Sequence, residues 1–296
     1  MSNLTDWFVN RLKQLDGFAK MLTRQTPKQI MVIEAPAELG KSWTLQRLYS
    51  DCRGQSVAVS LVDFRDRQPW DYLLLARQMR DQLGSEHFNL LTTLINQSTT
   101  ININLTTGES SGGPVNLNIA TEGGQISSSP VTIGDVAGGA IVKDNQFVVH
   151  ADSDTARRAI ELRITDAFVD ALKIMGQTQP VVLLFDSYED TTAEADRWLR
   201  FSFLTKIRDA LLPNVLVIIA GRTAPSIDPS WQPFVARTGL APLEEPFVRE
   251  YIIEKRKLTG LDVTTIFRTC GGHPGLLAKM ADIATVDKSD EKDWGL

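Results

Sequence analysis

The chain has 296 residues, of which 43% are hydrophobic and 23% are charged, a balance typical of globular proteins. At roughly 100–200 residues per domain, this length accommodates one large domain or two modest ones. The formal net charge of −5 gives the chain no overall attraction to nucleic acids or anionic membranes. Two distant cysteines and three histidines argue against a disulfide framework and a four-ligand zinc site.

The N-terminal sequence lacks a basic start followed by an apolar stretch, so it does not have the pattern of a signal peptide. The longest apolar runs, Val181–Phe185 and Val215–Ala220, are far shorter than the ~20 residues of a membrane-spanning helix. We therefore expect a cytoplasmic protein that is not inserted in a membrane.

An α/β pattern begins at the N-terminus. Apolar residues recur at helical spacing within 3–22, which predicts an N-terminal helix. The apolar run over 29–35 suits a buried strand of a parallel sheet. Helical spacing resumes over 41–51, and a strand over 56–64 and a helix over 70–83 complete this part of the pattern.

The same alternation continues in the C-terminal half of the chain. Apolar runs predict two further buried strands, over 180–186 and 214–221. Longer helices are expected over 154–175 and 194–211. A weaker strand and three short helices follow, over 234–240, 245–257, 263–269 and 275–284. Strands that alternate with helices indicate a parallel sheet covered by helices on both faces.

A stretch from about 98 to 150 interrupts this alternation and is rich in Gly, Ser, Thr and Asn. Apolar and polar residues alternate over 101–105, 115–119 and, less cleanly, 131–133, which predicts short β-hairpins. A long loop without regular structure is the alternative. Because the stretch begins where one βα unit ends, it is an insertion rather than a linker.

The most specific motif is APAELGKS, from Ala35 to Ser42, which fits G-x-x-x-x-G-K-[ST] except at its first position. Backbone N–H groups of such a loop bind phosphate oxygens, and the N-terminal end of the next helix attracts the same charges. We expect Lys41 to reach the β- and γ-phosphates and Ser42 to bind Mg²⁺. The predicted nucleotide-binding residues of this loop are Pro36, Ala37, Glu38, Leu39, Gly40, Lys41, Ser42 and Trp43. A chance GKS sequence is the alternative.

Two later strand ends carry polar residues that fit the same chemistry. Asp186 ends an apolar strand, in the position of a Walker B aspartate that holds Mg²⁺ through water. Arg222 follows the next apolar strand, where it can sense or neutralise a γ-phosphate. Open α/β sheets bind ligands at the carboxyl ends of their strands, so we expect these residues to converge on the loop. A solvated arginine is the alternative for Arg222, and we interpret the charged run Arg65-Asp66-Arg67 as a solvated surface.

With these residues, the chain resembles the STAND class of P-loop NTPases, the relatives of NACHT and NB-ARC switches and of archaeal-type ATPases. The sequence Ser187-Tyr188-Glu189-Asp190 matches the shape of the residues that follow the Walker B aspartate in that class. Phe8-Val9-Asn10-Arg11 is similar to its N-terminal signature and retains Arg11. Gly272-His273-Pro274 stands where members have the Gly-His-Pro turn of a helical lid.

The resemblance implies a P-loop NTPase fold with a sheet of order 5-1-4-3-2 and a small helical lid. It implies that ATP or ADP binds with Mg²⁺, that Arg11, His273 and Pro274 contribute to nucleotide binding, and that Arg222 acts as a sensor. In this class ADP holds a closed form, ATP favours an open and oligomerising form, and hydrolysis is slow. Such a change requires a ligand that binds the two forms with different free energies.

The chain departs from the family pattern at the phosphate loop and the Walker B strand. Ala35 replaces a glycine and lacks its freedom to adopt positive φ. Glu38 stands where the family usually has glycine, and like charges ~4 Å apart repel by ~1 kcal/mol in water and ~4 kcal/mol at an effective dielectric of 20. An outward-pointing Glu38 avoids most of this repulsion. A serine follows the Walker B aspartate where many relatives have glutamate, which leaves Glu189 or Asp190 to polarise the attacking water.

The sequence therefore predicts a P-loop NTPase core that is interrupted once. Residues 1–97 form its N-terminal part, 98–153 the Gly/Ser/Asn-rich β-type insertion, 154–243 its C-terminal part, and 244–296 the helical lid.

Our leading functional hypothesis is an ATP- or ADP-binding signalling switch whose nucleotide state controls assembly or partner binding. If the chain is an enzyme, it is a weak ATPase that uses Lys41, Asp186, Glu189 and Arg222. The first alternative is a catalytically degenerate scaffold that binds a protein partner or another copy through the polar strands of the insertion. The second is a DNA-associated ATPase, against which the acidic charge argues.

Overall fold

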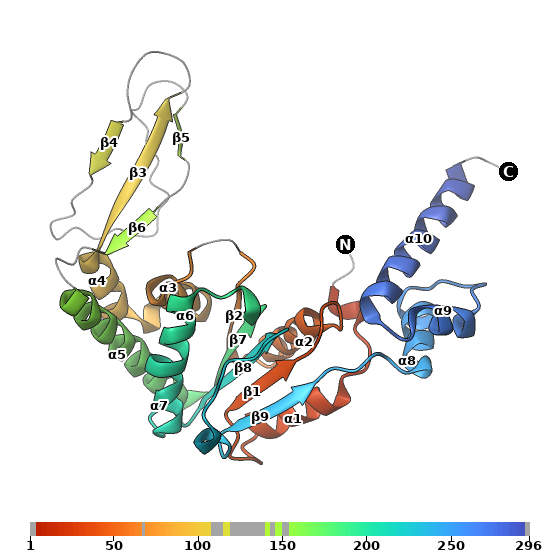
Figure 1. Ribbon diagram of the computed structural model, residues 1–296, viewed down its shortest axis with the longest axis horizontal. Coiled ribbons are helices and arrows are strands. Elements are labelled where there is room, and N and C mark those ends of the chain that lie inside the picture. The colour runs from red at the N-terminus through yellow and green to blue at the C-terminus, as the bar shows by residue number, and fades with distance from the viewer. Residues whose placement is uncertain are drawn as a thin grey trace. The chain divides into compact units, whose positions relative to one another are not determined.

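The computed structural model describes residues 4–66, 69–107, 115–118, 140–142, 146–149 and 154–293 (Figure 1). The chain divides into two compact units. The first comprises Met1–Phe88 and Phe168–Leu296, and the second comprises Asn89–Ala167. Within the described ranges, every helix is too short or too polar to cross a lipid bilayer.

A five-stranded parallel sheet forms the centre of the first unit, in the order β2-β7-β8-β1-β9 (Figure 1). In chain order the strands are β1 (Ile30–Glu34), β2 (Ala58–Asp63), β7 (Val181–Asp186), β8 (Val215–Gly221) and β9 (Val235–Gly239). Numbered along this unit and read from the β9 edge, the order is 5-1-4-3-2. The predicted fold class and strand order are therefore confirmed.

The burial of the strands explains why their sequences were informative. Every residue of β7 and β8 is buried, and the sequences VVLLFD and VLVIIAG are apolar almost throughout. A parallel sheet covered on both faces requires such continuous runs. The edge strand β9 alternates between more and less buried positions, which accounts for its weaker signal.

Helices α1 (Leu12–Leu22) and α2 (Lys41–Gly54) pack on the same face of the sheet. Phe18 of α1 and Leu45 of α2 belong to one buried cluster with the side chains of Ile33, Leu184 and Ile218. This packing places the N-terminal end of α2 at the carboxyl edge of the sheet, directly after the phosphate loop.

The single N-terminal helix predicted over 3–22 is wrong. A short 3-10 helix over Leu4–Trp7 is followed by a break, and α1 begins only at Leu12. Asn10 and Arg11 have positive φ values of 62° and 70°, which end any continuous helix. Apolar spacing persists across the break because Val9 packs with the C-terminal helices, while α1 packs on the sheet.

Helix α3 (Tyr72–Leu83) has bounds close to those predicted, over 70–83. Helices α6 (Ala193–Arg197) and α7 (Leu204–Arg208) lie where a single helix was predicted, over 194–211. The helix predicted over 194–211 contains a π-helical stretch, Trp198–Phe203, between α6 and α7. A π-helical turn has i→i+5 hydrogen bonds in place of the α-helical i→i+4 bonds, and the apolar spacing of the sequence did not reveal this change.

The segment predicted as a helical lid contains α8 (Glu245–Arg249), α9 (Val263–Cys270) and α10 (Pro274–Asp293) (Figure 1). A π-helical stretch, Glu250–Lys255, continues α8. These helices have their own buried cluster, which includes Val248, Ile252 and Leu277. The turn before α10 requires glycine, because a Cβ at Gly272 would lie 1.9 Å from the Leu243 carbonyl oxygen.

The second unit contains α4 (Asn89–Ser98), the first part of α5 (Asp154–Thr178) and an antiparallel sheet. In that sheet β3 (Thr99–Thr107) pairs with all of the other strands, β4 (Val115–Asn118), β5 (Ala140–Val142) and β6 (Gln146–Val149). Two of the predicted alternating segments fall on β3 and β4, and the segment 131–133 lies outside the described residues. Helix α4 was not predicted, since its sequence is rich in Asn and Thr, which are weak helix formers.

Candidate functional site

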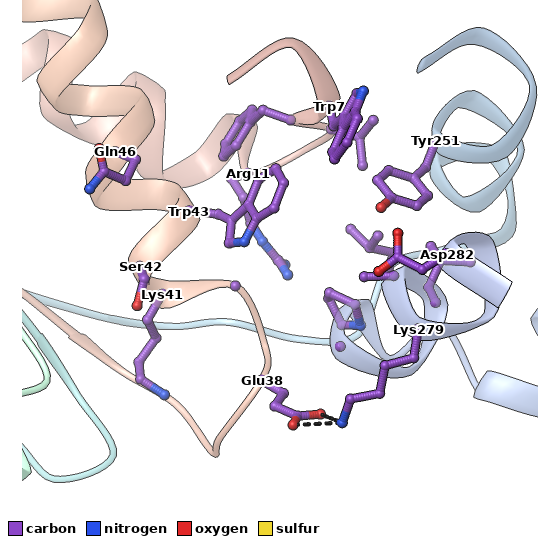
Figure 2. A pocket seen from close by; sticks show the side chains of 18 of the residues that line it. Trp7, Arg11, Glu38, Lys41, Ser42, Trp43, Gln46, Tyr251, Lys279 and Asp282 are labelled. Atoms are coloured by element: carbon purple, nitrogen blue, oxygen red, sulfur yellow. Dashed lines mark hydrogen bonds and ion pairs between the residues drawn. The ribbon is translucent and has the colours of Figure 1, made fainter. Parts of the chain in front are cut away.

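A cavity of about 580 Å³ lies where the phosphate loop, the N-terminal segment and the lid meet (Figure 2). The loop and α2 contribute residues between Glu38 and Gln46, and the N-terminal segment contributes Trp7 to Arg11. The lid contributes Tyr251 and several residues of α10. All of these elements belong to the first unit.

The phosphate loop between β1 and α2 tolerates Ala35 but is bent at two later positions. Ala35 is buried, does not have a positive φ, and donates its backbone N–H to the Gly221 carbonyl over 3.2 Å. The positive φ values occur at Glu38 (58°) and Gly40 (92°). The alanine therefore occupies a position that does not require glycine, and the unusual backbone is at Glu38.

The loop presents a series of backbone N–H groups without protein acceptors. From position 37 to position 43, these groups donate no hydrogen bond to any residue that the structure describes. The first helical bond at this end of α2 runs from the Thr44 N–H to the Gly40 carbonyl, over 2.9 Å. Free N–H groups at a helix N-terminus form a binding site for anions such as phosphate.

Lys41 lies within the loop rather than in solvent. Its Nζ donates hydrogen bonds to the carbonyls of Ala35 and Pro36, both over 2.7 Å. Burial lowers the pKa of the Lys41 ammonium group, and the nearby carboxylates of Glu189 and Asp186 oppose this shift. The ammonium group therefore already lies among the groups expected to bind phosphate and metal.

Ser42 and Asp186, the predicted metal-binding pair, lie close together. The nearby Ser42 hydroxyl favours the ionised Asp186 carboxylate, which accepts the Ser187 N–H over 2.8 Å. Only 4% of Asp186 is exposed, and burial raises the pKa of its carboxyl group above the ordinary value. A buried carboxylate next to a hydroxyl supplies the oxygen ligands that Mg²⁺ prefers.

The predicted catalytic residues Glu189 and Arg222 are paired with each other. Arg222 Nε lies 2.6 Å from Glu189 Oε1, and the Arg222 backbone N–H donates to Glu189 Oε2 over 2.7 Å. Burial opposes the ionisation of Glu189, but these hydrogen bonds hold its pKa below the ordinary value. Neither side chain lines the cavity, although both lie near the Lys41 ammonium group.

Arg11 connects the N-terminal segment to the loop. Its guanidinium donates to the carbonyls of Leu39 and Ala241, each over 2.7 Å, and the residue is buried. Because Ala241 precedes the lid, Arg11 holds the loop and the start of the lid together. The structure thus gives this predicted nucleotide-binding residue a clear positioning role at the wall of the cavity.

Glu38 points toward the lid, where it forms an ion pair with Lys279 of α10 (Figure 2). Its carboxylate oxygens lie 2.9 and 3.2 Å from Lys279 Nζ, and its backbone carbonyl accepts the Gly275 N–H over 3.1 Å. The hydrogen bond from Lys279 lowers the pKa of the Glu38 carboxyl group. A Cβ at Gly275 would lie 2.4 Å from the Glu38 carboxylate, so the two residues are closely packed.

The Gly-His-Pro turn lies at the start of α10. Pro274 lines the cavity, whereas His273 does not. His273 Nδ1 is buried and has no hydrogen-bond partner among the described residues. The structure therefore brings Pro274, and not the His273 side chain, to the cavity wall.

Several aromatic side chains form the remaining wall (Figure 2). Trp7, Phe8, Trp43 and Tyr251 line the cavity, and the Arg256 guanidinium stacks 4.3 Å from the Trp7 ring centroid. Flat aromatic surfaces of this kind suit a planar ligand such as a purine base. The helical spacing of Trp7 and Phe8 indicated only a packed helix, so their exposure to a cavity was not predicted.

Arg65 is a further cavity residue that the sequence did not identify. We interpret Arg65-Asp66-Arg67 as a solvated surface, and Arg65 is indeed exposed, but it also pairs with Asp63, lies 3.8 Å from Asp186 and lines the cavity. Its side chain is 58% exposed, so its charge remains accessible. Because the pairing depends on two adjacent strand ends, nothing in the local sequence indicated it.

No model of a known protein family and no curated protein sequence matches the chain. Among solved structures, it is similar to a STAND protein with a tetratricopeptide repeat sensor from Pyrococcus horikoshii, with a TM-score of 0.47 and 16% identity. That match covers 90% of this chain and 28% of the other. It is also similar to Cdc6p from Pyrobaculum aerophilum, with a TM-score of 0.44, 9% identity and coverage of 86% and 54%. The chain therefore spans about a quarter to a half of the length of these proteins.

Proposed function

We propose that this protein binds ATP or ADP together with Mg²⁺ and acts as a nucleotide-controlled switch, as the STAND proteins that its sequence resembles do. The observation that supports this most directly is the loop over 37–43, whose free N–H groups lie beside Lys41, Ser42 and the buried Asp186. An anion-binding loop, a lysine, a hydroxyl and a carboxylate are the groups that a P-loop nucleotide site requires.

The phosphates bind to the loop N–H groups and to Lys41. The Lys41 ammonium group then exchanges the carbonyls of Ala35 and Pro36 for phosphate oxygens, which are stronger, charged acceptors. Its pKa, lowered by burial, rises again when a polyanion binds beside it.

Ser42 and Asp186 would hold the metal ion. Mg²⁺ is commonly bound through one or two protein oxygens, substrate phosphates and water, rather than by a complete cage of side chains. When bound, the ion supplies positive charge that neutralises the phosphate oxygens.

The lid couples nucleotide binding to a change in shape. Glu38 and Lys279 join the loop to α10, and Arg11 joins the loop to the segment before the lid. A ligand that alters the contacts of the loop therefore alters the contacts that hold the lid. Such a ligand shifts the balance between two arrangements only by the difference between its affinities for them.

Hydrolysis is slow in this proposal. Arg222 occupies both carboxylate oxygens of Glu189, the side chain expected to polarise the attacking water. A general base that is held in an ion pair is a weak proton acceptor, because its pKa lies below the ordinary value. We expect turnover well below ~10 s⁻¹, the median for enzymes.

The test begins with extraction of the nucleotide carried by the purified protein. Sedimentation velocity is then measured with ADP and with ATP, each with Mg²⁺, while phosphate release is followed in parallel. A switch predicts bound adenine nucleotide, a sedimentation profile that differs between ADP and ATP, and slow phosphate release. Identical profiles at saturating concentrations of both nucleotides would contradict the switch, and the absence of any bound or binding nucleotide would contradict the site.

A further inference from the structure

Arg65 follows β2 and lies at the metal end of the candidate site. Its Nε is 3.0 Å from each oxygen of the Asp63 carboxylate, and its Nη2 is 2.5 Å from Oδ2. The same Nη2 lies 3.8 Å from Oδ2 of Asp186, the metal-binding carboxylate proposed above. One guanidinium therefore joins the acidic ends of two neighbouring strands.

The backbone that carries Arg65 is anchored by packing. The buried ring of Phe64 stacks on Phe185 with centroids 6.0 Å apart, and it meets Trp70 and Tyr188 edge-on at 5.8 and 6.1 Å. The Phe64 N–H also donates to the Asp186 carbonyl over 3.1 Å. The turn after β2 is thus joined to the end of β7, which keeps Arg65 close to Asp186.

The carboxylates of Asp63 and Asp186 lie close together, so a nearby cation stabilises them. Asp63 and Asp186 are register partners on adjacent parallel strands, so their side chains lie on the same face of the sheet. Only 4% of Asp186 is exposed. Arg65 partly neutralises this pair in the absence of a ligand.

Asp63 leaves part of the Arg65 guanidinium free. Arginine has five N–H donors, and Asp63 binds those of Nε and one on Nη2. The Nη1 donors form no hydrogen bond to any residue in the described ranges. Arg65 lines the same cavity as Lys41 and Ser42.

We propose that Arg65 binds the terminal phosphate of a nucleoside triphosphate, and that Asp63 positions its guanidinium for this contact. The proposal rests on nucleotide binding at the phosphate loop, as argued above. A planar guanidinium matches two phosphate oxygens at once, an arrangement that a lysine ammonium group cannot reproduce. A contact to the terminal phosphate favours ATP over ADP, which gives the site a means to distinguish the two states of the switch.

The test compares the dissociation constants of ATP and ADP, each with Mg²⁺, by isothermal titration calorimetry of the full chain. We expect Arg65→Ala to weaken ATP binding about tenfold or more and to change ADP binding by less than about threefold. Arg65→Lys should retain the charge but lose part of the preference for ATP. Asp63→Asn should shift the preference in the same direction by a smaller factor. The matched control is Arg53→Ala on α2, an exposed arginine that does not line the cavity.

Equal losses of ATP and ADP affinity in Arg65→Ala, or no loss of either, would overturn the proposal. If Arg65→Ala does not fold, as judged by circular dichroism, Arg65→Lys decides by the same ratio of dissociation constants. If nucleotide binding depends on Lys41 but Arg65→Ala leaves the ratio of the ATP and ADP dissociation constants unchanged, only the proposed role of Arg65 is rejected. The absence of nucleotide binding in the wild-type chain would reject both proposals.

Discussion

The side chain of Glu38 decides whether the phosphate loop is open to a polyanion. Glu38 has a positive φ, the conformation that favours glycine, and its carboxylate pairs with Lys279 on the lid. The carboxylate therefore faces the lid, and Glu38 still lines the cavity. Lys279 also lines the cavity. Its ion pair with Glu38 therefore engages a cation that would otherwise be available to a bound phosphate.

We expect Glu38→Gly to bind ATP about threefold to tenfold more tightly than the wild-type chain. The change removes a negative charge beside the phosphates and releases Lys279. Lys279→Ala provides the comparison, because it leaves Glu38 without its partner and should weaken binding. Calorimetric titration of both variants measures the effect. Weaker binding by Glu38→Gly would show that its carboxylate supports the nucleotide-binding form.

The buried carboxylate of Asp186 is expected to bind Mg²⁺ but to destabilise the ligand-free fold. Burial raises its folded-state pKa above the ordinary value of 3.8, so the folded chain holds its proton more strongly than the unfolded chain does. Stability is therefore lost as pH rises from 3.8 through the raised pKa, and at neutral pH the charged, buried carboxylate is destabilising.

Asp186→Asn should raise the melting temperature of the ligand-free protein at pH 7 by about 2–4 °C, the shift that ~1 kcal/mol produces in a domain of 150–250 residues. The difference between the variant and the wild-type chain should shrink below pH 4. The same variant should lose the effect of Mg²⁺ on nucleotide affinity. Differential scanning fluorimetry across this pH range provides the measurement. A lower melting temperature at pH 7 would mean that the carboxylate is well stabilised by Ser42 and Arg65.

Among individual residues, the sequence identified those whose roles depend on a local motif or on the end of a strand. Lys41, Ser42 and Asp186 meet because the loop and β7 end at the same edge of the sheet. The partners of Glu38 and Arg65 were not predicted. Lys279 lies 241 positions from Glu38 in the chain, and Asp63 meets Asp186 only through the pairing of β2 with β7.

Among the elements, the N-terminal segment differs most from its prediction. The break at Asn10 and Arg11 turns the chain so that the Arg11 guanidinium reaches the Leu39 carbonyl of the phosphate loop and Trp7 reaches the cavity. The apolar spacing alone could not show the break, since residues on both sides of it are buried against different clusters. The buried strands β7 and β8 were predicted closely, because both faces of each are covered.

We expect Arg11→Gln to reduce the free energy of unfolding by about 2–3 kcal/mol. The change removes charge-assisted hydrogen bonds to the carbonyls of Leu39 and Ala241 in a buried position. The matched control is Lys20→Gln on α1, whose exposed ion pair with Asp16 should contribute less than about 1 kcal/mol. Urea unfolding measures both. Equal stabilities of the two variants would show that Arg11 does not hold the loop.

At the scale of the whole molecule, the strand order could be predicted because the motifs assigned each strand a place in one known arrangement. Composition and periodicity alone indicated only a parallel sheet covered by helices. The cavity could not be predicted, since it is formed by three segments that are distant in sequence, around Trp7, Lys41 and Lys279. Its location at the carboxyl edge of the sheet nevertheless agrees with the general rule for ligand sites in open α/β sheets.

The most direct measurement is a calorimetric titration of ATP with Mg²⁺ into the wild-type chain, Lys41→Ala and Lys13→Ala. Lys13 is an exposed lysine of α1 outside the cavity, so its variant matches the lost charge. We predict that the wild-type chain and Lys13→Ala bind alike, whereas Lys41→Ala binds at least about 100-fold more weakly, a loss of ~2.7 kcal/mol. Equal affinities of Lys41→Ala and the wild-type chain would contradict phosphate binding at this loop.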